Sequence, residues 1–277
     1  MRQKIVIDQM HRKVKIPIFP KRIISLVPSQ TELLFDLGLD EEVVGITKFC
    51  VHPQQQFKIK PKVGGTKKYN FEKIKALQPD LIIGNKEEND QSQIEALAKE
   101  YPVWMSDIST FEEALDMIFF VGEMVNKVPQ AEQLLEKILL AFHAVQSNIP
   151  FGKSQLSVAY FIWQNPIMVA ASQTFIHEML EMAGFKNAFE NKIRYPQITI
   201  EELKTADPQV IFLSSEPYPF KEKHVAEMQS VFPNAIVQIV DGEMFSWYGS
   251  RLVRAADYFM EKCNGMMNDA SQMMNDE

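Results

Sequence analysis

The hydrophobic pattern is most regular between Pro129 and Asn148, where apolar side chains recur every three or four residues. The apolar positions are Ala131, Leu134, Leu135, Ile138, Ala141, Phe142, Val145 and Ile149. This spacing predicts an amphipathic helix, about 30 Å long, that Pro129 opens and Pro150 ends. Strand and helix patterns alternate on both sides of it. We therefore predict two α/β lobes joined by one long rigid helix.

Shorter patterns fill in the lobes. Alternating residues at 4–16 predict an edge hairpin, and apolar runs such as Ile23–Val27 and Leu81–Ile83 predict buried strands. The tail is rich in Met, Asn and Asp without periodicity, which is typical of disorder. The predicted organisation is an N-terminal lobe at 1–127, a linker helix at 128–149, a C-terminal lobe at 150–263 and a disordered tail at 264–277.

A gapless repeat supports the two-lobe organisation. Asn70–Ile83 aligns with Thr199–Phe212, and each segment has a capping residue, a short helix with an early glutamate, a proline and a buried strand. The repeated glutamates are Glu72 and Glu201. A carboxylate in a first helical turn is stabilised by the helix dipole, which is the structural interpretation. The functional alternative is a symmetric pair of acidic residues that faces a basic partner.

Net charge, cysteine count and the length of apolar runs exclude several classes of protein. A net charge of −7 and a pI near 5.4 argue against nucleic acid or an anionic membrane as the main partner. Two distant cysteines indicate neither a disulfide framework nor a zinc site. No apolar run reaches 18 residues, so the chain is predicted not to span a membrane. The first residues lack a signal-peptide pattern, which predicts a cytoplasmic protein as written, or a periplasmic one if a leader has been removed.

Candidate ligand-binding residues lie in loops that follow predicted strands, where α/β proteins bind their ligands. The set is aromatic and basic within an acidic protein, which suits a large, flat, partly anionic ligand. Each member also has a structural interpretation: Trp163 as strand core, for example, or Lys67 and Lys68 as a solvated turn. The residues are Thr66, Lys67, Lys68, Tyr69, Trp163, Arg194, Tyr195, Phe245, Trp247, Tyr248 and Arg251.

Two further patterns have mainly structural interpretations. Ser29 and Glu32 have the spacing of a capping box in front of an apolar helix, and we predict that capping explains both. The five histidines lack metal-ligand spacing, and only His52 is a candidate metal contact. No nucleotide-binding, metalloprotease or serine-hydrolase motif is present in the sequence. We predict a protein that is not an enzyme, with no catalytic residues, no metal site and no covalent cofactor.

Four segments of the chain resemble a known family. Arg22–Leu34 (RIISLVPSQTELL), the segment Pro79–Ile83, Tyr195–Gln197 and Ser250–Leu252 are similar to the substrate-binding proteins of vitamin B12 and ferric-siderophore ABC importers. The resemblance runs from about Val6 to Cys263. It implies the helical-backbone, class III periplasmic-binding-protein fold, with two Rossmann-like lobes and a ligand between them. It also implies that Glu72 and Glu201 dock on arginines of a membrane permease.

The combined hypothesis is a substrate-binding protein for a corrinoid or another small-molecule metal chelate, with an ABC permease as partner. A bound corrinoid or iron chelate would be cargo. One alternative is a ferric-siderophore or haem receptor. A second is a cytoplasmic enzyme or chaperone that handles the same class of chelate, with His52, Glu216 or Asp241 as acid/base groups.

Overall fold

The computed structural model describes residues 2–149 and 155–263, and these fall into two units. Unit 1 holds the described residues up to Ile108, together with Glu112–Lys137 and the short segment Trp247–Arg251. Unit 2 holds Ser109–Phe111 and the remaining described residues. The expected disordered tail at 264–277 lies outside the described residues.

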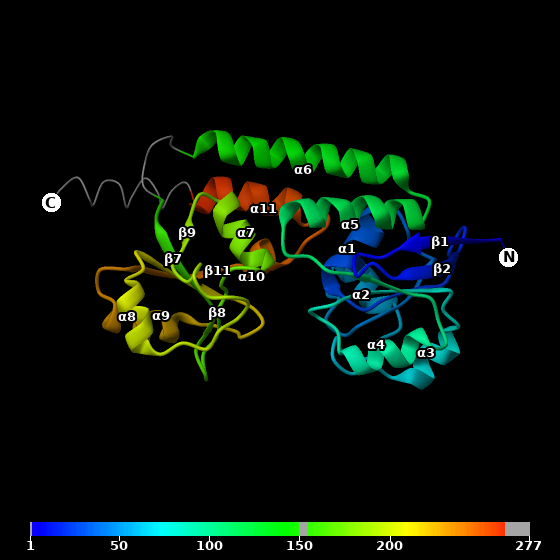
Figure 1. Cartoon of the computed structure of the whole chain (residues 1–277), viewed down its shortest axis with the longest axis horizontal. Helices are drawn as coiled ribbons and strands as arrows, with labels where there is room; N and C mark the ends of the chain where they lie inside the picture. Colours follow the sequence, from blue (N-terminus) through cyan, green and yellow to red (C-terminus); the bar gives the residue numbers. More distant parts are fainter. Residues whose placement is uncertain (1, 150–154, 264–277) are drawn as a thin grey trace. The chain divides into compact units, whose positions relative to one another are not determined.

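Unit 1 is built on a parallel sheet of four strands in the order β4-β3-β5-β6, and its helices are labelled in Figure 1. The strands are β3 (Ile23–Ser25), β4 (Val43–Ile46), β5 (Leu81–Asn85) and β6 (Val103–Ser106). The helices are α1 (Pro28–Asp36), α2 (Gln54–Ile59), α3 (Phe71–Leu77), α4 (Gln91–Ala98) and most of α5 (Phe111–Met124). Buried aliphatic side chains of β3 and β5 and of helices α3 and α4 form the core. Strands β3, β5 and β6 are buried along their whole length, as expected for a parallel sheet covered on both faces.

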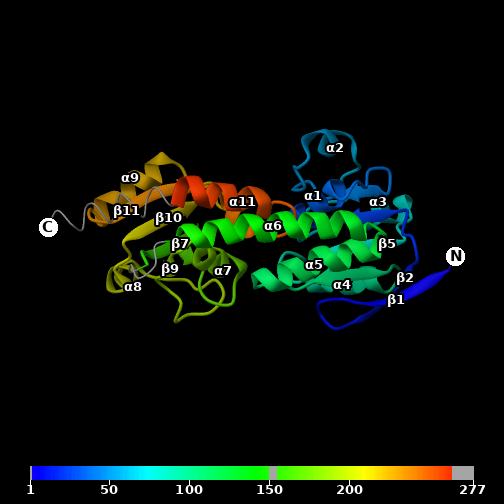
Figure 2. The same cartoon turned by 90° about the horizontal axis from the view of Figure 1, so that it is seen from above.

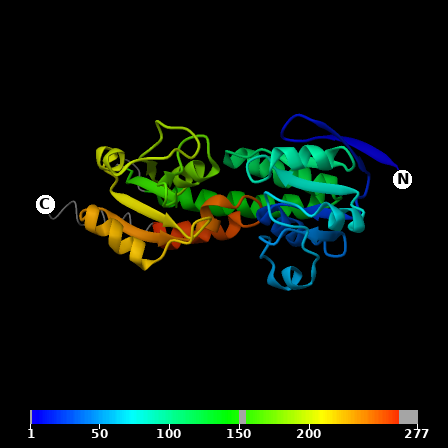
Figure 3. The same ribbon diagram turned by 90° about the horizontal axis from the view of Figure 1, so that it is seen from below.

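The predicted edge hairpin is confirmed as β1 (Gln3–Ile7) and β2 (Lys13–Pro17), an antiparallel pair separate from the parallel sheet (Figure 3). Its turn is fastened to unit 1. The Asp8 carboxylate pairs with Arg12, whose guanidinium also donates to the carbonyl of Val103, and the backbone N–H of Gln9 donates to the carbonyl of Met105. The hairpin is therefore held at the β6 edge.

The predicted linker helix is present as α6 (Val128–Asn148), an uninterrupted helix (Figure 2). Residues of α6 up to Lys137 belong to unit 1, and those from Ile138 onward belong to unit 2. Ala131, Ile138, Phe142 and Val145 from the predicted apolar stripe are buried. The spacing of apolar residues therefore identified both the helix and its packed face.

Unit 2 has a mixed sheet in the order β11-β10-β7-β8, in which β9 also pairs with β7. Within the described residues of this sheet, β8 runs antiparallel to β7 and the other pairs are parallel. The strands are β7 (Ser157–Trp163), β8 (Met168–Val169), β9 (Lys186–Asn187), β10 (Val210–Ser214) and β11 (Ile236–Val240). The helical elements are α7 (Phe175–Met182), α8 (Ile200–Ala206), α9 (Glu222–Val231), α10 (Gly242–Ser246), α11 (Leu252–Tyr258) and the π-helical turn η1 (Phe259–Cys263).

The sequence repeat has the same local geometry in both units. The N-cap side chains of Asn70 and Thr199 each accept a hydrogen bond from the backbone N–H three residues on, at the start of α3 and α8. Both helices have seven residues, and both end at a left-handed residue, Gln78 with φ 47° and Asp207 with φ 43°. The proline that follows cannot extend the helix, so in each repeat the backbone leaves the helix and continues into the next strand.

Within the described ranges, none of the helices combines the length and the apolar character needed to cross a lipid bilayer.

Candidate ligand-binding site

Loops at the carboxyl ends of parallel strands form the candidate site within each unit. In unit 1 these loops follow β3, β4 and β5. In unit 2 they follow β7, β10 and β11. The predicted residues divide between the two units, and we describe each group in its own unit.

The predicted capping box at the start of α1 is wrong. The N-cap is Val27, which has no side chain that can accept a hydrogen bond, and Pro28 occupies the first turn. Proline suits this position because it lacks the N–H that would otherwise need a partner. The carboxylate of Glu32 instead accepts two hydrogen bonds from Arg251, at 2.9 Å from Nε and 2.8 Å from Nη2.

Arg251 is therefore a buried ion-pair partner in unit 1. Both Glu32 and Arg251 are at most 5% exposed. Burial raises the pKa of Glu32, and the charge and hydrogen bonds of Arg251 oppose that shift. The Arg251 guanidinium also lies 4.9 Å from the ring centre of Trp247, and the His52 ring meets the same indole edge-on at 5.6 Å. These contacts join the loop after β4 to the segment Trp247–Arg251.

Two more of the predicted aromatic residues are buried. Tyr248 lies inside unit 1, where burial raises the pKa of its hydroxyl. Phe245 belongs to the core of unit 2, where its ring lies 5.2 Å from that of Tyr160 and 4.9 Å from that of Phe259. The ring of Phe245 is fully buried in this structure, so it supports neighbouring side chains and offers no surface to a ligand.

The loop Gly65–Tyr69 is ordered by internal hydrogen bonds. The Tyr69 hydroxyl donates to the carbonyl of Thr66 at 2.7 Å, and the side-chain amide of Asn89 donates to the same carbonyl at 3.1 Å. Burial raises the pKa of Tyr69. The Lys67 ammonium donates to the carbonyl of Glu87, while Lys68 is exposed. Tyr69 therefore shapes this loop, and the two lysines supply its positive charge.

Phe49 in the loop after β4 was absent from the predicted set. Its ring is 48% exposed, and the Lys48 ammonium lies 4.9 Å from its centre. An aromatic residue next to a lysine just after a strand was the available signal. It has the same aromatic and basic character as the residues that were selected.

In unit 2, Trp163 ends β7 and is 39% exposed. Its indole N–H donates to the carbonyl of Asn165, and its ring meets that of Tyr218 edge-on at 5.4 Å. Tyr218, which follows β10, was not selected from the sequence. Together they form an aromatic pair at the carboxyl ends of two adjacent parallel strands.

Arg194 and Tyr195 lie beside β8. The amide of Ala171 donates to the carbonyl of Arg194, which fixes this segment next to the end of the strand. Arg194 has φ 61°, a left-handed conformation, and its guanidinium donates to the carbonyl of Gln173. The guanidinium carbon lies 5.9 Å from the centre of the Tyr195 ring. An exposed cation and a half-buried ring are thus held together.

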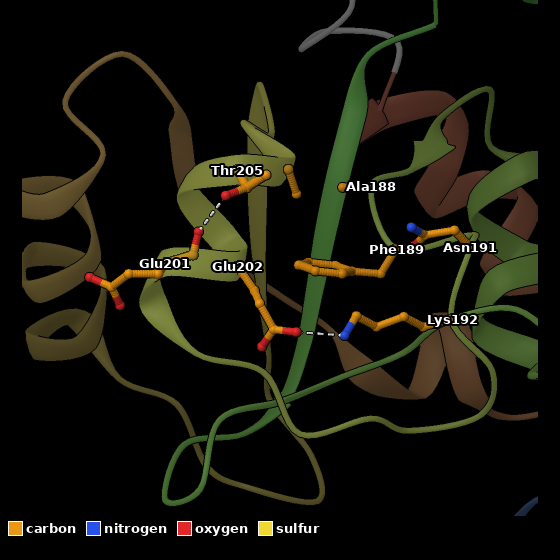
Figure 4. Close-up of a pocket in the computed structure, with 8 residues that line it drawn as sticks. Ala188, Phe189, Asn191, Lys192, Glu201, Glu202 and Thr205 are labelled. Atoms are coloured by element: carbon orange, nitrogen blue, oxygen red, sulfur yellow. Dashed lines mark hydrogen bonds and ion pairs between the residues drawn. The ribbon is translucent and has the colours of Figure 1, made fainter.

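The repeated glutamates both lie exposed in the first turns of their helices, Glu72 in α3 and Glu201 in α8. A pocket of about 410 Å³ adjoins Glu201 (Figure 4). Lys192 and Glu202 form an ion pair of 2.7 Å in its wall, and the Thr205 hydroxyl donates to the backbone carbonyl of Glu201. The geometry leaves the Glu201 carboxylate at the surface.

Among the described residues, no group of three or more histidine, cysteine, aspartate or glutamate side chains is arranged to hold a metal ion. The acid/base candidates have structural contacts instead. Glu216 accepts a hydrogen bond from the Ser246 hydroxyl, and Asp241 accepts one from the amide of Glu243. His52 belongs to unit 1, whereas Glu216 and Asp241 belong to unit 2.

Comparisons with known proteins agree on one family. The family described as "Periplasmic binding protein" matches residues 23–237. An uncharacterised ABC transporter substrate-binding lipoprotein of Bacillus subtilis, YvrC, is 27% identical, with 92% of this chain and 83% of that protein covered. A vitamin B12-binding protein of Pectobacterium carotovorum is 24% identical, with 91% of each chain covered.

Solved structures show the same fold. The vitamin B12-binding protein BtuF of Vibrio cholerae matches with a TM-score of 0.71 and 24% identity, over 88% of this chain and 96% of that one. The periplasmic haem-binding protein BhuT, in complex with two haems, matches with a TM-score of 0.76 and 23% identity, over 88% and 98%.

Proposed function

Because the chain belongs to the periplasmic binding protein family, we propose that it is the substrate-binding component of an ABC importer. The proposed cargo is a metal chelate of the corrinoid class, with haem and ferric siderophores as related ligands. Relatives named vitamin B12-binding protein and the structural match to a haem-binding protein support this class. An importer takes up its cargo from outside the cytoplasmic membrane, so the proposed function requires the protein to act on that outer side.

One observation carries the proposal: rings at strand ends are paired with a cation or with another ring. Phe49 lies beside Lys48, Tyr195 beside Arg194, and Trp163 beside Tyr218. Flat macrocycles stack on aromatic faces, and cations bind their carboxylate or phosphate groups. Each unit, taken by itself, has at least one such pair.

The alternative of an enzyme or chaperone has less support. Its acid/base candidates are divided between the units, and the carboxylates of Glu216 and Asp241 already accept hydrogen bonds, from the Ser246 hydroxyl and from the backbone amide of Glu243. The named relatives are binding proteins.

Ligand binding is tested by isothermal titration of the purified chain with cyanocobalamin, haemin and a ferric hydroxamate siderophore. We expect one of the three to bind with a Kd of about 1 μM or tighter, equivalent to roughly −8 kcal/mol. Failure of all three ligands at 50-fold higher concentrations (~50 μM) would reject the proposed cargo class.

The site is tested by Trp163→Ala and Arg194→Ala. Loss of a stacking ring is expected to weaken binding by about 10-fold, because such contacts contribute roughly 0.5–1.5 kcal/mol beyond area burial. Phe119→Ala is the matched control, since Phe119 is a similarly exposed ring on α5. Equal effects of Trp163→Ala and Phe119→Ala would show that the strand-end loops do not hold the ligand.

Glu72 and Glu201 are the proposed contacts with the permease. Each is exposed, lies in an equivalent first turn and is available for a charge-assisted hydrogen bond to arginine. In Glu72→Ala/Glu201→Ala, ligand affinity should stay unchanged, while binding to the permease in detergent or nanodiscs should weaken by about 10-fold or more. The exposed pair Glu95 and Glu136, changed in the same way, is the control.

A further inference from the structure

The outer face of the β1–β2 hairpin carries an unusual combination of side chains. Register pairs Ile5 with Lys15 and Ile7 with Lys13, and directly opposed residues of an antiparallel pair share a face. Ile5 is 66% exposed and Ile7 is 59% exposed, and both lysines are exposed as well. The opposite face buries Val14 and Ile16 against unit 1. Figure 2 shows the hairpin as a two-stranded arm, in dark blue.

The N-terminal segment that contains the hairpin has a net charge opposite in sign to that of the whole chain. Residues 1–22 contain seven lysine or arginine residues and one acidic residue, Asp8, which is paired with Arg12. Their formal charge of +6 lies within a chain of −7, so the remaining residues carry −13. The net charge of the chain alone does not reveal this uneven distribution of charge along the sequence. A local basic segment in an acidic chain is a mark of interaction with an anionic surface.

We propose that this face binds the anionic surface of a lipid bilayer. Lysines beside exposed isoleucines match both layers of a membrane interface, because ammonium groups meet lipid phosphates while apolar side chains enter the boundary with the acyl chains. Lys13 and Lys15 have long aliphatic stems that allow the ammonium groups to reach the headgroups while the isoleucines insert.

The size of the face favours a bilayer over a protein partner. Two five-residue strands span about 17 Å by about 10 Å, or roughly 170 Å², whereas a stable protein interface buries roughly 800 Å² on each partner. Binding to a lipid surface does not require a large area of complementary shape. The hairpin would supplement the contact with a permease and does not depend on the proposed cargo.

Lysine on an exposed strand also prevents edge-to-edge pairing, and isoleucine favours strands. A purely structural explanation of these residues therefore predicts no affinity for lipid.

The test is a sedimentation assay in which the full chain is mixed with vesicles in 50 mM or 500 mM NaCl. One set of vesicles contains phosphatidylcholine alone, and the other contains phosphatidylcholine with 30% phosphatidylglycerol. We expect binding to the anionic vesicles at 50 mM salt, at least 10-fold weaker binding at 500 mM salt, and none to neutral vesicles.

Variants separate the two contributions. Lys13→Gln/Lys15→Gln should lower the partition coefficient about 25-fold, because each basic residue near an anionic surface contributes roughly 5-fold. Ile5→Ser/Ile7→Ser should lower it about 10-fold by removing the apolar contact. Lys58→Gln/Lys223→Gln removes two exposed lysines elsewhere and should change it less than 2-fold. Far-UV circular dichroism establishes that each variant is folded.

Three results would overturn the proposal: no sedimentation with anionic vesicles, equal sedimentation with neutral vesicles, or equal losses in the hairpin and control variants. If instead light scattering shows a dimer that Ile5→Ser/Ile7→Ser dissociates, and vesicles bind nothing, the face pairs two copies of the chain and the lipid assignment is wrong.

Discussion

The residues Glu32 and Arg251 are separated by 219 positions and form a buried, two-point ion pair in unit 1. Arg251 also stacks on Trp247, so its guanidinium has partners on its edge and on its face. Planar recognition of this kind is specific to arginine. A buried pair of charges is costly to break, because the remaining charge has lost both water and its partner.

Glu32→Gln is expected to lower the free energy of unfolding by roughly 3–5 kcal/mol, since it leaves the Arg251 charge buried without a counter-charge. Glu32→Leu/Arg251→Met should recover most of that loss, because two apolar side chains replace two buried charges. Both are measured by urea denaturation followed by circular dichroism.

The control for this prediction is Glu190→Gln. Lys186 and Glu190 form an ion pair of 3.1 Å in which both side chains are about half exposed. Solvent screens such pairs, so a change of at most about 0.5 kcal/mol is expected. If Glu32→Gln were as mild as Glu190→Gln, the pair would not be a structural contact of the folded protein.

Among the elements, α3 and α8 show how far local sequence determines structure. Their capping residues, early glutamates and final prolines were all visible in the repeat, and the structure confirms two short helices with these caps. Both helices end at a residue in the left-handed region, although neither residue is glycine. Aspartate tolerates this region better than most residues, whereas glutamine is strained there, so the backbone conformation is unfavourable chiefly at Gln78.

Gln78→Gly is expected to raise the free energy of unfolding by roughly 0.5–1 kcal/mol, because glycine adopts φ 47° without a steric penalty. Gln78→Ala is the control. It removes the same exposed side chain and retains the Cβ atom, so its stability should stay close to that of the wild type. Chemical denaturation at constant pH measures both. A gain in Gln78→Ala equal to that in Gln78→Gly would contradict the backbone argument.

Contacts between residues far apart in the sequence could not be predicted, for a physical reason. The periodicity of α6 and the buried strands depend on neighbours within a few residues, and these were predicted. The partner of Glu32 depends on the folded path of the chain, so its spacing from Ser29 was interpreted as a capping box. Phe245 and Trp247 are two residues apart, yet one lies in the core of unit 2 and the other in unit 1. No local pattern distinguishes them.

At the scale of the whole molecule, α6 runs from unit 1 into unit 2 with the boundary between Lys137 and Ile138, whereas α5 has only its first residue, Phe111, in unit 2. A helix is cooperative along its length, because each turn shares hydrogen bonds with the next. Among the described residues, one hydrophobic cluster lies in each unit, and the two clusters share no side chain. Coupling between their unfolding reactions therefore depends on the integrity of this helix and on the segment Trp247–Arg251.

We expect the wild type to unfold in a single calorimetric transition and Lys137→Pro to unfold in two. Lys137 is exposed at the unit boundary within α6, and an interior proline costs a helix roughly 3 kcal/mol. Lys137→Ala, which keeps the helical hydrogen bonds, should retain the single transition. Two transitions in the wild type would show that α6 does not couple the units.

The return of Trp247–Arg251 to unit 1 has a consequence for any attempt to dissect the protein into fragments. A truncation that ends at Lys137 would contain every strand of the first sheet, yet it would lack the cation that Glu32 requires. Such a fragment would be an incomplete domain despite its contiguous sequence. Joining residues 247–251 to it through a designed connection is the minimal repair.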